Sequence, residues 1–236
     1  MFPLKDNIPS RRFPCVTVTL IAVNVLVFFH ELSLGPYLER FVFVYGVVPK
    51  RYFLLSFLGL NSFSAKYLPL FTSMFLHGGW LHLIGNMWYL WIFGDNVEDS
   101  MGRLRFFVFY LLCGIGASLV HVYTHPYSTL PTIGASGAIS GVMGAYFVLF
   151  PFARIITLVP IFLFLTMVEI PALFFLLFWF MFQFFHGTFS ILTPSSFYGG
   201  VAWWAHIGGF ICGIILVFFF KKRQRRRFYP DEYRPW

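Results

Sequence analysis

Long apolar stretches, each near the length of a membrane-spanning helix, alternate with short polar segments along this chain of 236 residues. A helix needs about 20 apolar residues to cross a bilayer. The pattern therefore predicts an all-α membrane protein with a six-transmembrane-helix domain at 16–220, an N-terminal segment at 1–15 and a tail at 221–236. The predicted spans are 16–33, 80–97, 104–123, 137–153, 168–187 and 201–220.

Two further apolar regions need their own interpretation. The connection 34–79 is interrupted by Pro49-Lys50-Arg51, which favours a partly embedded first loop or surface helices over a seventh span. The run 155–186 is too short for two spans and a turn. Glu169 and Pro171 resemble the first turn of a helix. We therefore predict an interfacial stretch at 155–167 and a fifth span that begins at 168.

Composition and charge support a membrane protein and argue against a nucleic-acid partner. The chain is 58% hydrophobic and 11% charged, whereas soluble domains carry roughly 25% charged residues. Much of the net charge of +8 comes from the block KKRQRRR at 221–227, directly after an apolar run, where it is typical of a cytoplasmic anchor. With six spans both termini share one side, and most of the Lys and Arg lie there. We expect cytoplasmic termini and a plasma-membrane location.

Three polar sites lie near the starts of predicted spans that run in the same direction. They are Ser136, His206 and the pair His82/Asn86. Counted back from Arg154, Lys221 and Glu98, which mark the far ends of these spans, Ser136, His206 and His82 lie roughly 27, 22 and 24 Å away at 1.5 Å per residue. These side chains therefore share one layer of the membrane and can meet.

The chemistry of this layer favours a serine nucleophile. A serine needs a base within hydrogen-bonding reach, and His206 suits that role. The usual third member is a carboxylate that orients the imidazole, but every Asp and Glu near a span falls at a span end. The sequence therefore predicts a Ser–His dyad, with packing or an aromatic ring such as Tyr146 or Trp204 to hold the histidine.

The same layer offers donors for an oxyanion. His82 and Asn86 are four residues apart and share a helix face. Ser136 begins a helix, where free backbone N–H groups favour negative charge. Gly134 and Gly137 beside the serine allow a substrate carbonyl to approach closely.

Each feature also has a plain structural interpretation. The spacings Gly137/Gly141 and Gly209/Gly213 are typical of close helix packing, which here would bring Ser136 to His206. A lone serine in a span usually bonds its own helix. The sequence has no HExxH zinc motif, and His121 and His125 lack an evident third ligand, so we expect no bound metal.

Four segments of the sequence resemble motifs of the rhomboid intramembrane serine proteases, in the order of that family. HGGWLHLIGN is similar to the second-helix motif, GDNVEDSMG to the turn after it, GASG to the nucleophile motif and AHIGG to the last-helix motif. The resemblance implies a six-helix bundle with a water-filled cavity open to the outside, an embedded first loop and no cofactor. It makes Ser136 the nucleophile, His206 the general base, His82 and Asn86 oxyanion-stabilising, and Gly209 a packing residue.

One position departs from the family pattern. Many members carry a tyrosine four residues after the nucleophile, stacked on the catalytic histidine, and here that residue is Ser140. The working hypothesis is an intramembrane endopeptidase acting on transmembrane protein substrates. A rhomboid-like protein that binds membrane helices without cutting them, or a small transporter, is the alternative. The substrate, the cleavage preference, the support of His206, the element that admits substrate and the oligomeric state stay open.

Overall fold

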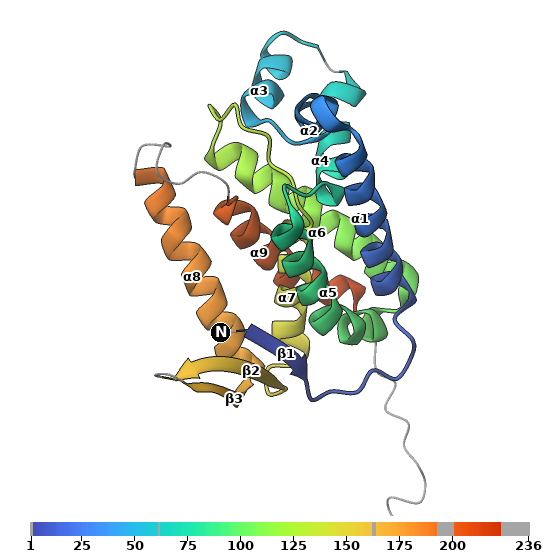
Figure 1. Cartoon of the computed structure of the whole chain (residues 1–236), viewed down its shortest axis with the longest axis vertical. Helices are drawn as coiled ribbons and strands as arrows, with labels where there is room; N and C mark the ends of the chain where they lie inside the picture. The colour runs from blue at the N-terminus through green and yellow to red at the C-terminus, as the bar shows by residue number, and fades with distance from the viewer. Residues whose placement is uncertain (1, 61, 162–163, 193–200, 223–236) are drawn as a thin grey trace, which may run out of the picture.

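The computed structural model describes residues 2–60, 62–161, 164–192 and 201–222, and most of them are helical (Figure 1). The long helices are α1 (Cys15–Ser33), α5 (Trp80–Met101), α6 (Arg103–Thr124), α7 (Ser136–Leu149), α8 (Ala172–Leu192) and α9 (Trp203–Phe220). The short ones are η1 (Gly35–Tyr37), α2 (Leu38–Tyr45), α3 (Pro49–Phe57), η2 (Phe63–Tyr67), α4 (Leu68–Thr72) and η3 (Ser73–Phe75). The strands are β1 (Phe2–Asp6), β2 (Arg154–Ile161) and β3 (Phe164–Pro171).

Each predicted span overlaps with one of the long helices, and the boundaries differ by a few residues. Among the described residues, four helices (α1, α6, α8 and α9) are long and apolar enough to cross a membrane. The other two differ: α5 carries three carboxylates in its last two turns, and α7 has 14 residues. The chain is thus a helical, multi-pass membrane bundle, and the count of six spans stays a prediction.

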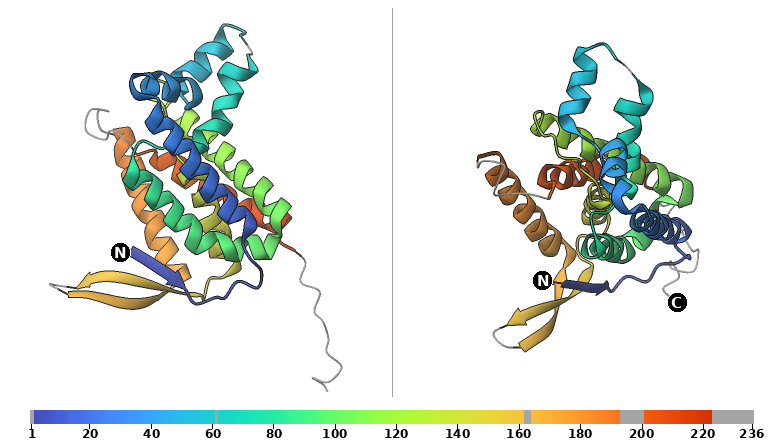
Figure 2. Two further views of the ribbon diagram at one scale, coloured as in Figure 1. Left: turned by 45° about the vertical axis from the view of Figure 1, so that its right-hand side comes forward. Right: turned by 45° about the horizontal axis from the view of Figure 1, so that its top comes forward.

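Helix α7 lies at the centre of the bundle. Every residue from Gly137 to Tyr146 is buried, so this helix meets protein on all sides, and its apolar character all round fits that position. Its neighbours α5, α6, α8 and α9 surround it in the views of Figure 2.

Glycines let α7 and α9 approach until their backbones touch. A Cβ added at residue 209 would lie 2.9 Å from the carbonyl carbon of Gly137 and closer still to its oxygen. A Cβ at residue 213 would meet the backbone of Gly141 in the same way. The predicted packing role of these glycines therefore has a direct steric basis.

The connection 34–79 folds into short helices at one end of the bundle, away from the sheet (Figure 1). Arg51 donates to the carbonyl oxygens of Phe43, at 2.6 Å, and Gly46, at 2.8 Å, which closes the connection on itself. Val47 pairs with Thr132 in an isolated β-bridge. The expectation of short helices is confirmed, whereas their depth in a bilayer stays a prediction.

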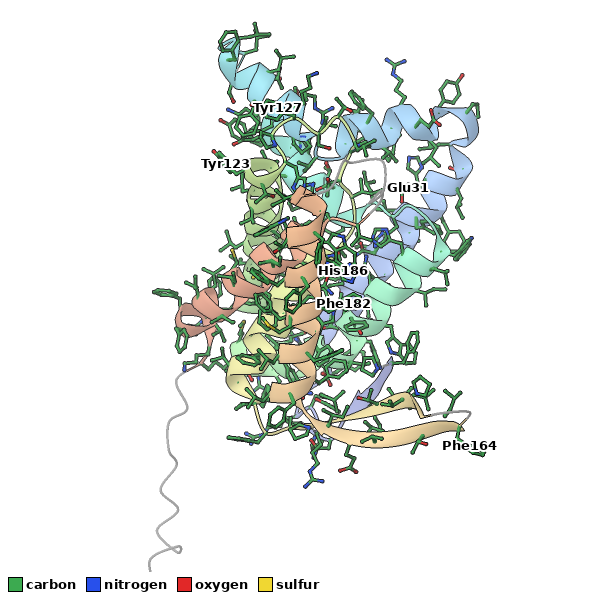
Figure 3. The ribbon with its side chains drawn as sticks, turned by 90° about the vertical axis from the view of Figure 1, so that its left-hand side faces the viewer. Glu31, Tyr123, Tyr127, Phe164, Phe182 and His186 are labelled. Atoms are coloured by element: carbon green, nitrogen blue, oxygen red, sulfur yellow. The ribbon has the colours of Figure 1, made fainter. Side chains whose placement is uncertain are left out.

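The all-α prediction is wrong at the opposite end of the bundle. Where the sequence predicts an interfacial stretch at 155–167, the described residues 155–161 and 164–167 belong to a three-stranded antiparallel sheet of order β1-β2-β3, and Phe164 lies near the far end of its hairpin (Figure 3). The segment RIITLVPI is rich in β-branched residues, which favour strands. Ile155 and Thr157 are buried on one face.

The predicted helix start at Glu169 and Pro171 is also wrong. Both residues lie in β3, and Glu169 forms a 3.0 Å ion pair with Arg154 of β2. The helix begins at Ala172, whose N–H donates to the carbonyl of Ala153. The sheet therefore continues into α8 without a linker.

Candidate functional site

Ser136 and His206 meet where α7 and α9 begin. Ser136 is the first residue of α7, and His206 lies in the first turn of α9. The serine Oγ and the His206 Nε2 are 2.8 Å apart. The counted depths allow this meeting, and the glycine contacts further along the same two helices hold it.

The other nitrogen of the imidazole contacts a residue that the sequence interpretation missed. His206 Nδ1 lies 2.8 Å from Oε1 of Gln183 on α8, and Gln183 is 5% exposed. The aromatic residues considered for this support have other partners, since Tyr146 donates to Asp6 and Trp204 donates to the carbonyl of Gly187. In the sequence, Gln183 could have been singled out as an amide inside an apolar predicted span, because a polar side chain there is costly unless it has a hydrogen-bond partner.

Ser140, at the position of the aromatic residue common in the family, is buried and bonds its own helix. Its Oγ donates to the carbonyl of Ser136 at 2.6 Å, as a serine in a helix often does. Its Cβ would be 3.2 Å from a Cβ added at residue 209. The contact shows why residue 209 is glycine, and the imidazole of His206 is contacted from α8.

His82 and Asn86 lie against the loop that leads into Ser136. Gly134 has a φ of +121°, a conformation that L residues rarely adopt. A Cβ added there would be 2.6 Å from His82 Nε2 and 3.6 Å from Asn86 Nδ2. His82 and Asn86 therefore lie against Gly134, two residues before the serine that begins α7.

A second missed residue, His77, supports Asn86 from the segment before α5. The amide Nδ2 of Asn86 lies 3.0 Å from His77 Nε2, and the backbone N–H of His77 donates to the buried carboxylate of Glu31 at 3.1 Å. Burial, together with the neighbouring His82, lowers the pKa of His77 to about 4. A neutral imidazole can accept a hydrogen bond from the amide, so this environment fixes the direction in which Asn86 points.

A small cavity borders the serine. Its volume is about 20 Å³, and its lining includes Ser73, Thr132, Gly134 and Ser136. A space of this size holds about one water molecule. The polar atoms around it suit a water that approaches the serine.

The described residues contain no group of three His, Cys, Asp or Glu side chains suited to a metal ion. What the site presents is a hydroxyl hydrogen-bonded to an imidazole, with amide and imidazole donors beside it. These are the groups that acyl transfer requires: a nucleophile, a base and hydrogen-bond donors for a developing oxyanion.

Comparison with known proteins supports a family assignment. The family model described as "Rhomboid domain" matches residues 64–223. The chain is 34% identical over 156 residues to the human presenilin-associated rhomboid-like protein, mitochondrial. These residues make up 63% of this chain and 37% of that protein. It is 32% identical over 144 residues to rhomboid protein 1, mitochondrial, of Saccharomyces cerevisiae (59% of this chain, 38% of that protein).

A bacterial relative is similar to the same degree. The rhomboid protease GluP of Bacillus subtilis is 34% identical over 133 residues, which cover 56% of this chain and 24% of that protein. In each case the match spans well under half of the relative's own length. The family model, in contrast, covers more than half of this chain and includes all four motifs. The chain belongs to the rhomboid family.

Proposed function

We propose that the protein is an intramembrane serine endopeptidase that hydrolyses peptide bonds in or near transmembrane segments of other membrane proteins. The observation that carries this proposal is the 2.8 Å contact between Ser136 Oγ and His206 Nε2, with His82 and Asn86 beside the serine. Family membership supports the reaction class, and one relative of similar sequence is named rhomboid protease GluP.

In the proposed reaction, Ser136 Oγ attacks the scissile carbonyl carbon while His206 Nε2 takes the hydroxyl proton. The proton then passes to the leaving amine as the C–N bond breaks, which leaves an acyl-enzyme. Water, deprotonated by the same imidazole, attacks the ester, and the imidazolium returns this proton to Ser136 Oγ as the ester C–O bond breaks and the new carboxyl end is released. The negative charge on the carbonyl oxygen in each step is stabilised by His82, Asn86 and the backbone N–H of Ser136.

The proposal includes a membrane arrangement. Six spans leave the ends of the domain 16–220 on one side, and the basic block 221–227 favours the cytoplasm for that side. The segment 1–15 and the tail 221–236 are then cytoplasmic, and the dyad opens to the outside of the plasma membrane. The connection 34–79 is the partly embedded first loop. Substrates are helices that enter from the bilayer and unwind locally, because a helical peptide bond is shielded by its neighbours.

The test uses purified protein in detergent with a fluorophosphonate probe and a generic transmembrane substrate. Wild type, Ser136→Ala and His206→Ala are compared side by side. Labelling and cleavage in wild type alone support the proposal. Equal labelling of Ser136→Ala refutes the nucleophile assignment. A wild type that binds the substrate without labelling or cleavage supports the non-cutting binder instead.

A further inference from the structure

The support of His206 comes from a third helix. Gln183 lies near the middle of α8 with its amide oxygen 2.8 Å from His206 Nδ1, while Ser136 Oγ lies 2.8 Å from Nε2. The imidazole is therefore bonded at both nitrogens, by residues from α7 and α8. Gln183 is almost fully buried, so its oxygen is fixed there without competition from bulk solvent.

The two contacts restrict each other. For the serine to donate its proton, His206 Nε2 has to be the unprotonated nitrogen, so in the neutral ring the proton sits on Nδ1. A protonated Nδ1 is a donor and needs an acceptor, which the amide oxygen of Gln183 provides. The side chain thus stabilises the one tautomer in which the imidazole can act as a base.

Contacts between α8 and α9 on both sides of the amide hold it in place. His186 stacks on Trp203 with ring centroids 4.8 Å apart, and Phe182 contacts the same ring at 6.0 Å. Figure 3 shows Phe182 and His186 on α8. One turn beyond Gln183, the Trp204 indole N–H donates to the carbonyl of Gly187 at 2.9 Å.

We propose that Gln183 is a positioning residue for His206: it fills the place of the orienting carboxylate in a serine–histidine–carboxylate triad and selects the Nδ1-protonated tautomer. This inference rests on the proposed function, in which His206 is the base. An amide differs from a carboxylate in one respect. It carries donors as well as an acceptor, so it supports the productive tautomer only while its oxygen faces the ring.

The experiment compares three changes on α8 in the full-length protein. Gln183→Met removes the acceptor at similar volume, and Gln183→Glu keeps an oxygen at the same distance from the backbone. Thr188→Val is the matched control, because Thr188 bonds only the carbonyl of Phe184 within α8 among its described contacts. Thermal unfolding of each variant separates loss of fold from loss of positioning.

In the activity assay, we expect Gln183→Met to lower kcat about 10- to 100-fold with KM within about twofold, in line with the loss of a buried hydrogen bond to a functional histidine. Gln183→Glu restores most of the rate, and Thr188→Val matches wild type. A Gln183→Met enzyme with wild-type kcat overturns the inference, as does a loss that Gln183→Glu fails to restore in a folded protein.

A readout that is independent of turnover distinguishes this inference from the proposed function. The ¹⁵N shifts of the His206 ring, assigned by comparison with His206→Ala, report which nitrogen carries the proton. We expect Nδ1 in wild type and a mixture of tautomers in Gln183→Met. Unchanged shifts refute the role of Gln183 even in an active protease. Wild type that is inactive but shows the expected shifts refutes the function and leaves the tautomer assignment standing.

Discussion

Replacement of Gly209 by alanine tests whether helix contact sets the distance between Ser136 and His206. The added Cβ would lie 2.9 Å from the carbonyl carbon of Gly137, closer to its oxygen, and 3.2 Å from Ser140 Cβ, whereas ordinary contact begins at 3.4 Å. The obstacle is backbone, which has no other rotamer to adopt. The helices α7 and α9 therefore have to separate by roughly 1 Å, since a packed interior has no spare volume.

That separation acts directly on the dyad. The Ser136–His206 distance of 2.8 Å would rise beyond hydrogen-bonding range. A misplacement of about 1 Å at a reacting group costs about 100-fold in rate, which corresponds to roughly 2.7 kcal/mol. Overpacking also lowers the free energy of unfolding by about 1–3 kcal/mol.

The assay is the rate of fluorophosphonate labelling, measured beside cleavage and thermal unfolding. Gly85→Ala is the matched control: it lies on α5, and a Cβ there meets nothing within 4 Å. We expect a large loss of labelling rate for Gly209→Ala and none for Gly85→Ala. A Gly209→Ala protein that is labelled at more than half the wild-type rate refutes the steric reasoning.

Other predictions concern the surroundings of the site. Because folding lowers the pKa of His77 from 6.5 to about 4, the unfolded chain binds more protons between these pH values. The free energy of unfolding therefore falls as the pH drops through this window, by up to about 3 kcal/mol. His77→Gln should flatten this dependence of the free energy of unfolding on pH, and an unaltered pH dependence contradicts the reasoning. The Glu98 carboxylate accepts the backbone N–H and the hydroxyl of Thr17, at 2.8 and 2.9 Å. Glu98→Ala should therefore lower the free energy of unfolding by about 2 kcal/mol, and a change below about 0.5 kcal/mol, the usual size for surface positions, refutes this. Gly134→Ala should displace His82 and lower the cleavage rate about 100-fold, with wild-type cleavage as the contrary result.

The helices and the shared depth of the polar side chains follow from local rules. Spans are set by length and hydropathy, and depth along a helix follows from a constant rise per residue. The counted depths place Ser136, His206 and His82 in one layer, where they can meet, and the packing of the helices decides that they do. Their roles in catalysis are a separate matter and stay predictions.

The sheet and the support of His206 depend on long-range contacts that local patterns do not contain. A continuous apolar run does not distinguish a strand from a buried helix, and the partners of β2 lie both near the start of the chain and in β3. Gln183, His186 and Ser190 follow one face of α8, but this spacing does not indicate which neighbouring helix that face meets. Only the packing of α8 on α9 determines that the amide faces the imidazole.

The position of Ser136, Gln183 and His206 on three successive helices also orders events during synthesis. Ser136 is made first, Gln183 follows on α8, and His206 comes 70 residues after the serine. Until α9 has entered the membrane and docked, the serine has no base and the amide has no ring to orient. A nascent chain in the translocon therefore carries an inert hydroxyl, and the proposed protease cannot act on neighbouring helices, or on its own, before assembly is complete.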